Sequence, residues 1–259
     1  MKKLVAAVMV VLLLILGLMA SCAGVKVLGS GNVINEAFNL SDFTGIKAQN
    51  GFQVEVTKSD SFSVVAIVDD NVLEHIEIKK SGDTLIIRPK ANRSFRSVTL
   101  SAKVTMPDID KLELSGGAKV EINGFDSYNN LPVTLSGGSH LNGSINARDV
   151  NLSLSGGSHV TTLSGSADNL MANLSGGSHV TLSGSADSID IKGSGGSHYN
   201  LQDYSVSDAD INLSGGSHAN VHVNGTLNVD ISGGSEVSYT GEPTLGDIEV
   251  DWESELIER

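Results

Sequence analysis

Apolar and polar residues alternate with a period of two along much of this 259-residue chain, a pattern typical of half-buried β-strands. Phe52-Gln53-Val54-Glu55-Val56 is a clear example. The pattern predicts further strands at 63–68, 76–78, 85–87 and 97–106, and Pro107 ends the last of them. Ser81-Gly82-Asp83 indicates a hairpin turn and Asp69–His75 a single helical turn. Residues 31–108 are therefore expected to form a β-rich N-terminal part.

A Ser-Gly-Gly step recurs through the second half of the chain and defines a repeat array over 109–240. The seven copies start at Ser115, Ser136, Ser155, Ser175, Ser194, Ser214 and Ser232. The intervals are 21, 19, 20, 19, 20 and 18 residues, so the period is about 20. A fixed period of this length is typical of a solenoid, in which each repeat buries its apolar face against its neighbours.

One repeat, residues 150–169, shows how each turn should be built. The side chains expected to point inward are Leu152, Leu154, Val160 and Leu163, and those expected to point outward are Asn151, Ser153 and His159. Gly156-Gly157 should make one corner, because glycine reaches positive φ without steric cost. Further corners are expected at 164–166 and 167–169. Three short sides per repeat describe one rung of a parallel β-helix.

The expected fold is therefore all-β: a single-stranded parallel β-helix (β-solenoid) with about 20 residues per rung, preceded by β-rich N-terminal rungs, with rungs about 4.8 Å apart. A β-propeller needs about 40 residues per blade, and seven repeats do not pair evenly into such blades. Regular Leu, Val and Ile residues between the glycines exclude a disordered Gly/Ser linker.

The central repeats read Ser-Gly-Gly-Ser-His, so stacking should align five imidazoles in a ladder. The members are His140, His159, His179, His198 and His218, and the outer copies carry Lys119 and Glu236 instead. Two neighbouring imidazoles could share Zn, Ni or Cu, protonation could make a pH-sensitive face, or the row could contact a ligand. The alternative is that repeat duplication copied an exposed residue that stacks without harm. Whether a metal binds here is left open.

Aspartates recur near the proposed third corner and form a second candidate ladder. They are Asp149, Asp168, Asp187 and Asp208. Aspartate at a corner can cap its own backbone, and stacked carboxylates could instead recruit Ca²⁺. The chain lacks the nine-residue calcium repeat of β-rolls, which favours turn capping.

No pattern in the sequence predicts catalysis or a cofactor. The acids repeat evenly, whereas sugar-cleaving sites need a distinct pair of carboxylates. Ser139-His140 and its copies do not form a diad, because successive strand residues face opposite ways. We therefore expect a protein that is not an enzyme.

The first 21 residues have the pattern of an export signal. Lys2 and Lys3 precede an apolar stretch, Leu4–Met19, and small residues then lead to Cys22, the one cysteine in the chain. Leu18-Met19-Ala20-Ser21-Cys22 resembles a lipobox, which implies cleavage before Cys22 and lipid attachment to it. Plain secretion and a retained membrane helix are the alternatives. Residues 22–30 would then be a lipidated tether.

Charge limits the partners of the mature chain. The whole chain carries a formal charge of −13, and losing Lys2 and Lys3 would make it −15. Phosphate backbones would repel such a protein, so nucleic acid is not an expected partner. The same argument predicts that acyl chains, and not electrostatic attraction, hold it at the membrane. The absence of an acidic run in 23–26 favours the outer membrane, on a periplasmic or surface face left undecided. The acidic tail 241–259 should cover the last rung.

Several short motifs resemble those of the putative auto-transporter adhesin, head GIN domain family. They are Gly29-Ser30-Gly31-Asn32-Val33, Leu40-Ser41-Asp42-Phe43-Thr44-Gly45-Ile46, Gly51–Val56, Asp69-Asp70-Asn71-Val72-Leu73 and Val104-Thr105-Met106-Pro107. The resemblance covers about residues 28–240 and implies a β-solenoid on a bacterial envelope lipoprotein, with no catalytic residues to carry over. We expect a lipid-anchored protein that binds or adheres to glycan or protein. The alternatives are a non-adhesive structural or sensory envelope module and divalent-metal binding along the histidines.

Overall fold

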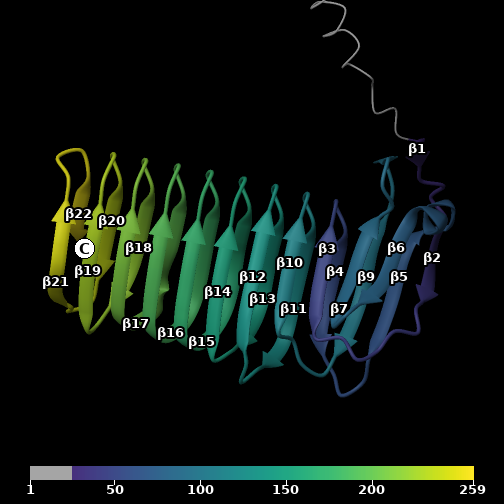
Figure 1. Cartoon of the computed structure of the whole chain (residues 1–259), viewed down its shortest axis with the longest axis horizontal. Helices are drawn as coiled ribbons and strands as arrows, with labels where there is room; N and C mark the ends of the chain where they lie inside the picture. The colour runs from purple at the N-terminus through teal and green to yellow at the C-terminus, as the bar shows by residue number, and fades with distance from the viewer. Residues whose placement is uncertain (1–24) are drawn as a thin grey trace, which may run out of the picture.

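The computed structural model describes residues 25–259, and these form the expected β-solenoid (Figure 1). Strands stack side by side along one long axis, and the core is the apolar interior of the stack. The predicted export signal and the predicted lipidation site, Cys22, lie outside the described residues. Across 25–259, no helix is long and apolar enough to cross a bilayer.

The repeat array is built from parallel strands in register. The strands are β10 (Lys111–Ser115), β11 (Lys119–Asp126), β12 (Asn130–Ser136), β13 (His140–Asn146), β14 (Asp149–Leu154), β15 (His159–Leu174), β16 (His179–Gly193), β17 (His198–Leu213), β18 (His218–Val223), β19 (Thr226–Ile231) and β20 (Glu236–Thr240). Equivalent residues of successive repeats pair directly, as Ala172 does with Ile191 and Ile191 with Ile211. Each repeat therefore stands on the previous one.

The Ser-Gly-Gly-Ser turn makes this stacking possible. In the fourth copy, Gly176 and Gly177 have φ of 63° and 72°, a region that a side chain would disfavour. The backbone N–H of Gly177 donates to the carbonyl of Gly195 in the next turn at 3.0 Å. The buried hydroxyl of Ser178 donates to the carbonyl of Ser175 at 2.8 Å and closes the turn. The same serine hydrogen bond recurs at Ser139, Ser158, Ser197, Ser217 and Ser235.

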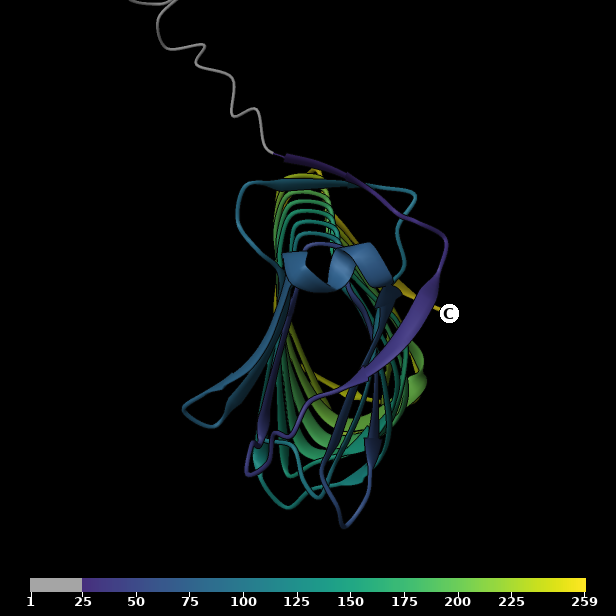
Figure 2. The same ribbon diagram turned by 90° about the vertical axis from the view of Figure 1, so that its right-hand side faces the viewer.

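The other two expected corners are not breaks between strands. β15 runs without interruption for 16 residues through 164–166 and 167–169, so the chain bends there while its backbone pairing continues. Gly165 at φ 151° and Gly184 at φ 129° lie within this bend. A Cβ at Gly184 would lie 1.9 Å from the Gly165 carbonyl oxygen, which explains the glycine. Figure 2 shows the resulting elongated cross-section, with a tight turn at one end and a broader bend at the other.

The inward positions of the repeat are those that the alternation predicts. Leu152, Leu154, Val160 and Leu163 are all buried. Two neighbouring interior columns depart from aliphatic packing in one repeat. Tyr199 lies between Val180 of the preceding repeat and Ala219 of the following one. Gly193 lies between Leu174 and Leu213 in the same way. The Tyr199 hydroxyl crosses the interior, donates to the carbonyl of Lys192 at 2.5 Å and accepts from the N–H of Leu174 at 3.1 Å.

The rung formed by β3 and β4 comes first in the sequence, but it lies inside the stack with strands on both of its edges. β3 (Gly45–Gln49) pairs with β7 (Thr84–Pro89) on one edge and with β10 on the other. β4 (Gln53–Lys58) likewise lies between β9 (Leu100–Met106) and β11. The chain therefore builds outward from β3 and β4, returns, and then continues into the array on their other side.

An antiparallel cap closes the N-terminal end. β5 (Ser63–Asp69) pairs with β9, β2 (Val33–Ala37) with β5, and β6 (Ile76–Ser81) with β7, all antiparallel. The expected helical turn is the 3₁₀ helix η1 (Asp70–His75), and the expected hairpin joins β6 to β7. A separate two-stranded ribbon of β1 (Val25–Leu28) and β8 (Arg93–Arg96) lies at the same end (Figures 1 and 2).

The acidic tail covers the array by adding one more rung. β21 (Thr244–Val250) and β22 (Glu255–Glu258) continue the parallel pairing on β19 and β20. Residues 251–254 replace the Ser-Gly-Gly-Ser turn: the Asp251 carboxylate accepts from the N–H of Gly233 at 2.8 Å, and the Ser254 hydroxyl from the N–H of Ser235 at 3.1 Å. The outer edges of β21 and β22 pair with no other described strand.

Substitutions at Tyr199 and Gly193 should compensate each other in their effect on the free energy of unfolding, because the Tyr199 ring occupies the space that a side chain at position 193 would fill. A Cβ at Gly193 would lie 2.9 Å from the Tyr199 ring and 2.7 Å from Leu213, so Gly193→Leu alone should be overpacked. Tyr199→Val alone should lose about 2–4 kcal/mol of unfolding free energy, because it leaves a cavity and an unfilled hydrogen-bonding position. The double variant restores the aliphatic repeat and should recover more than half of that loss in urea denaturation. Additive losses in the double variant would contradict this coupling.

Candidate functional site

The five ladder histidines form one continuous stack. His140, His159, His179, His198 and His218 pair in register, with ring centroids 5.0, 4.9, 4.6 and 5.1 Å apart and interplanar angles of 8°, 4°, 5° and 10°. Lys119 pairs with the first member and Glu236 with the last, so the column has a cation at one end and an anion at the other. The stacked arrangement predicted from the repeat is thus present.

The ladder is an environment that disfavours protonation. Burial lowers the pKa of His140 below its usual range, and the charges of His159 and Lys119 lower it further. Burial likewise lowers the pKa of His179, with smaller contributions from His198 and His159. A backbone carbonyl of the glycine turn opposes the shift in both cases. The neutral forms of His140 and His179 are therefore favoured in the folded protein.

The stack does not present a chelating site. Metal-binding lone pairs lie in the plane of an imidazole, and nearly parallel rings direct them in parallel. Two nitrogens on adjacent rings therefore do not converge on one ion at about 2.1 Å. No group of three or more His, Cys, Asp or Glu side chains within residues 25–259 is arranged to hold a metal. This geometry favours the pH-sensitive or ligand-contacting interpretation of the ladder.

The four aspartates do not share one column. Asp149 pairs with Asn169, which pairs with Ser188, which pairs with Asp208, so the first and last members are aligned through neutral residues. Asp168 and Asp187 lie one position before this column and are aligned with each other, because the intervals of 19, 19 and 21 residues shift the register. Asn169 donates to the carboxylate of Asp149 at 2.7 Å, and the N–H of Thr226 donates to that of Asp208 at 2.8 Å. Both donors belong to the next rung, so these two carboxylates link successive rungs, and the capping of their own turns stays a prediction.

A polar groove of about 600 Å³ runs along the strands that lead into the glycine turns. Its lining consists of two stacked columns of polar residues, with Leu154, Leu174 and Gly193 between them. One column is Thr134, Ser153, Asn173, Lys192 and Asn212, and the other is Ser155, Ser175, Ser194 and Ser214. The groove thus extends over several rungs with one cation, and Lys192 is paired with Asp190 at 2.8 Å.

The groove was not predicted from the sequence, although its signal was present. The alternation placed Ser153 outward, and the same position in the following repeats holds Asn173, Lys192 and Asn212. Comparing equivalent outward positions across all repeats, as for the histidines, would have identified this column of hydroxyls and amides.

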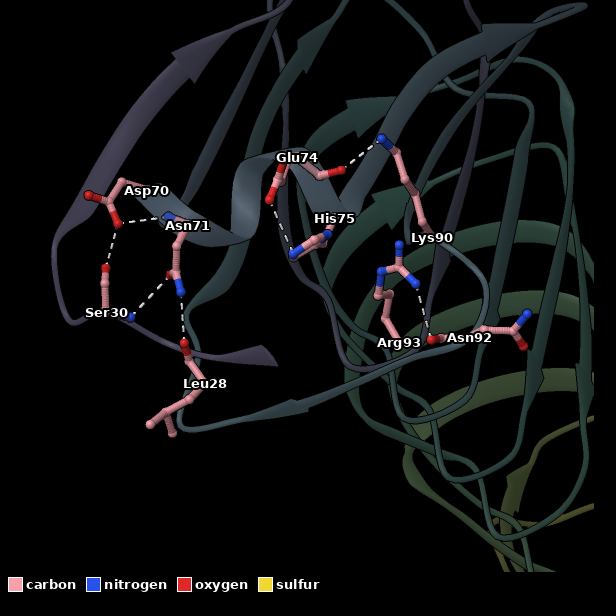
Figure 3. Close-up of polar contacts among 9 residues, drawn as sticks. All are labelled: Leu28, Ser30, Asp70, Asn71, Glu74, His75, Lys90, Asn92 and Arg93. Carbon is pink, nitrogen blue, oxygen red and sulfur yellow. Dashed lines mark hydrogen bonds and ion pairs between the residues drawn. The ribbon is translucent and has the colours of Figure 1, made fainter. Parts of the chain in front are cut away.

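A set of polar contacts, here called the clamp, fixes residues 28–31 to residues 69–71 of the cap (Figure 3). Ser30 donates its hydroxyl to Asp70 at 2.5 Å, and its backbone N–H donates to Asn71 at 3.1 Å. Asn71 in turn donates to the carbonyl of Leu28 at 2.8 Å. Asp69 is buried and accepts from the N–H groups of Gly31 and Thr99, both at 2.7 Å.

The clamp explains two of the sequence motifs. The hydrogen bonds from Thr99 and Gly31 lower the pKa of Asp69, and those from Ser30 and Asn32 lower that of Asp70. Gly29-Ser30-Gly31-Asn32 and Asp69-Asp70-Asn71, far apart in sequence, are therefore the two halves of one structural contact.

Comparison with known families identifies the chain. The profile described as "Putative auto-transporter adhesin, head GIN domain" matches residues 42–181 and 167–243. The chain belongs to this family. The family and the solenoid fold together indicate an adhesin-like protein associated with the cell envelope. A search of curated proteins found no match.

Solved structures share the fold of this head GIN domain protein. A protein described as a putative adhesin from Parabacteroides merdae ATCC 43184 has a TM-score of 0.83 at 18% identity, over 90% of this chain and 99% of that chain. One described as a putative lipid binding protein from Parabacteroides distasonis ATCC 8503 has 0.81 at 19%, over 91% and 100%. A putative adhesin from the same strain has 0.78 at 17%, over 91% and 98%. At these identities the likeness shows the fold alone.

The ladder should make stability depend on pH. Because the folded-state pKa of His140 and His179 is lowered, the unfolded chain takes up protons first, and stability should fall as pH drops below about 6.5. The carboxylates with lowered pKa, such as those of Asp69 and Asp70, become protonated only near pH 4 and below, so their contribution to the free energy of unfolding is constant over this range. Replacing all five ladder histidines with Gln should reduce the fall in melting temperature between pH 7.5 and pH 5. An equal fall in both proteins would refute a role for the ladder.

Proposed function

We propose that this protein is a lipid-anchored adhesin-like protein that binds glycan or protein partners along the polar face of its solenoid. The observation that carries the proposal is the groove of about 600 Å³, whose hydroxyl and amide columns repeat over several rungs. Repeated small polar groups offer many shallow hydrogen bonds, which suit an extended ligand better than a compact one.

A neutral glycan fits this groove well. The lining contains serine, threonine and asparagine side chains, which both donate and accept hydrogen bonds as sugar hydroxyls do. Its one cation, Lys192, already pairs with Asp190, and the surrounding repeats are acidic, so a polyanionic ligand would be repelled. The stacked rungs also hold the groove rigid, which reduces the entropy lost on binding.

Glycan binding should depend on the two asparagines of the groove. An array of neutral oligosaccharides identifies a ligand, and titration calorimetry then compares variants. Asn173→Ala/Asn212→Ala should weaken binding about 30-fold, because each of the two side chains supplies hydrogen bonds worth about 1 kcal/mol. The matched control is Asn200→Ala/Asn220→Ala, a stacked pair on the histidine side of the turn, and it should bind normally. An array without any bound glycan would count against the glycan form of the proposal.

The proposed site of lipid attachment is Cys22. It follows a lipobox-like sequence, it is the one cysteine of the chain, and the cap binds the chain firmly from Val25 onward. An outer-membrane location follows from the same sequence, with Ala23 after the cysteine and no acidic run.

Cys22→Ser should abolish lipidation and signal cleavage. The natural protein should partition into the detergent phase and begin at an acylated Cys22 by mass spectrometry. The variant should accumulate as an uncleaved precursor without acyl mass, because the sulfur that receives the lipid is lost. A natural protein that starts elsewhere, without added lipid mass, would refute the anchor.

A further inference from the structure

Charge is segregated along the solenoid axis, although the whole protein is acidic. Residues 22–119 carry twelve Lys or Arg and twelve Asp or Glu, so the end of the molecule that includes the cap is formally neutral. Residues 120–259, which comprise the rest of the array and the acidic tail, carry three and eighteen, so together they account for the entire charge of −15. The net charge of −15 predicts repulsion from anionic lipid for the protein as a whole. That prediction does not apply to the end nearest Cys22, which carries no net charge.

The ribbon of β1 and β8 presents a basic surface at that end. In a parallel pair, paired residues project to the same face, and alternate residues project to opposite faces. Val27 is 5% exposed, and its partner Phe95 packs against the core. The opposite face consists of Lys26, Leu28, Ser94 and Arg96, all exposed, with Leu28 at 62%. We call these four residues the ribbon face.

The cations around the ribbon lack carboxylate partners. Lys26, Lys90, Arg93 and Arg96 form no ion pair with any residue in 25–259, whereas Lys47, Lys79, Arg88, Lys103 and Lys111 in the same half do. Segments 25–30 and 90–98 contain no acidic residue. Asp69 and Asp70, which hold the chain after β1, are themselves occupied by the hydrogen bonds of the clamp.

We propose that the ribbon face docks on the anionic headgroups of the membrane that holds the lipid anchor. The proposal rests on lipidation at Cys22, as proposed above. Val25 is three residues after Cys22, so an extended chain places β1 within about 10 Å of the anchor. Lys26 and Arg96 then meet lipid phosphates, and exposed Leu28 meets the boundary of the acyl region.

Through the clamp, docking of the ribbon face would set the orientation of the whole solenoid. Ser30, Asp70 and Asn71 join the ribbon to the cap, and the cap pairs with the array through continuous backbone ladders. A docked ribbon therefore fixes the solenoid relative to the membrane, instead of leaving it on a flexible tether. Repulsion between the acidic array and the anionic surface keeps the groove-bearing repeats away from the lipid.

The test uses the acylated protein in vesicles. A fluorophore at Ser94→Cys reports on the ribbon face, since Cys22 is blocked by lipid, and one at Asp187→Cys reports on the array. Vesicles contain phosphatidylcholine alone or with phosphatidylglycerol, and neutral acrylamide is the quencher. The Ser94 probe should be quenched several-fold less on the anionic vesicles at low salt, with protection lost at high salt. The Asp187 probe should be quenched equally on both.

Two double variants assign the effect to the ribbon face. Lys26→Gln/Arg96→Gln should remove the protection, whereas Lys58→Gln/Lys80→Gln, which removes two other cations without ion pairs to described residues, should retain it. Equal quenching of the Ser94 probe on both vesicles, or protection by dissolved inorganic phosphate without vesicles, overturns the proposal. Vesicle flotation is measured alongside. Failure to float refutes the anchor and with it the docking, and flotation without protection refutes the docking alone.

Discussion

Parallel backbone pairing in strict register is the constraint on which this structure depends. Each rung can bond to the next only if every turn returns the chain to the same starting point. The paired glycines at positive φ and the buried serine of each turn achieve this. Because register is kept along the strands that lead into each glycine turn and at the first residues after it, a residue repeated there in sequence becomes a column in space. The histidine stack, the polar groove and the aliphatic interior are all such columns.

The same constraint separates the tasks of the molecule along its axis. Interior columns supply stability, and outward columns remain free to vary, as the change from Thr134 through Asn173 to Lys192 shows. The N-terminal end differs, since its antiparallel cap closes the stack and its ribbon carries cations that form no ion pair with any residue in 25–259. One end is thus suited to attachment and the long face to recognition.

Much of the fold could be predicted from the sequence, because a 20-residue period with two-residue alternation has few physical solutions. The inward residues, the glycine corner, η1, the β6–β7 hairpin and the histidine stack are all as predicted. The aspartate column was wrong, because one-residue differences in repeat length move a side chain to the next position. The threading of β3 between β7 and β10 has no local signal, since it depends on which edges remain free.

That threading has a consequence for biogenesis. β3 and β4 are made early, yet each stays with an open edge until residues 84–126 arrive to flank them on both sides. A chain made from its N-terminus therefore cannot complete its first rung segment by segment. The early strands must wait as exposed, aggregation-prone edges, so a holding chaperone would have a defined interval in which to act.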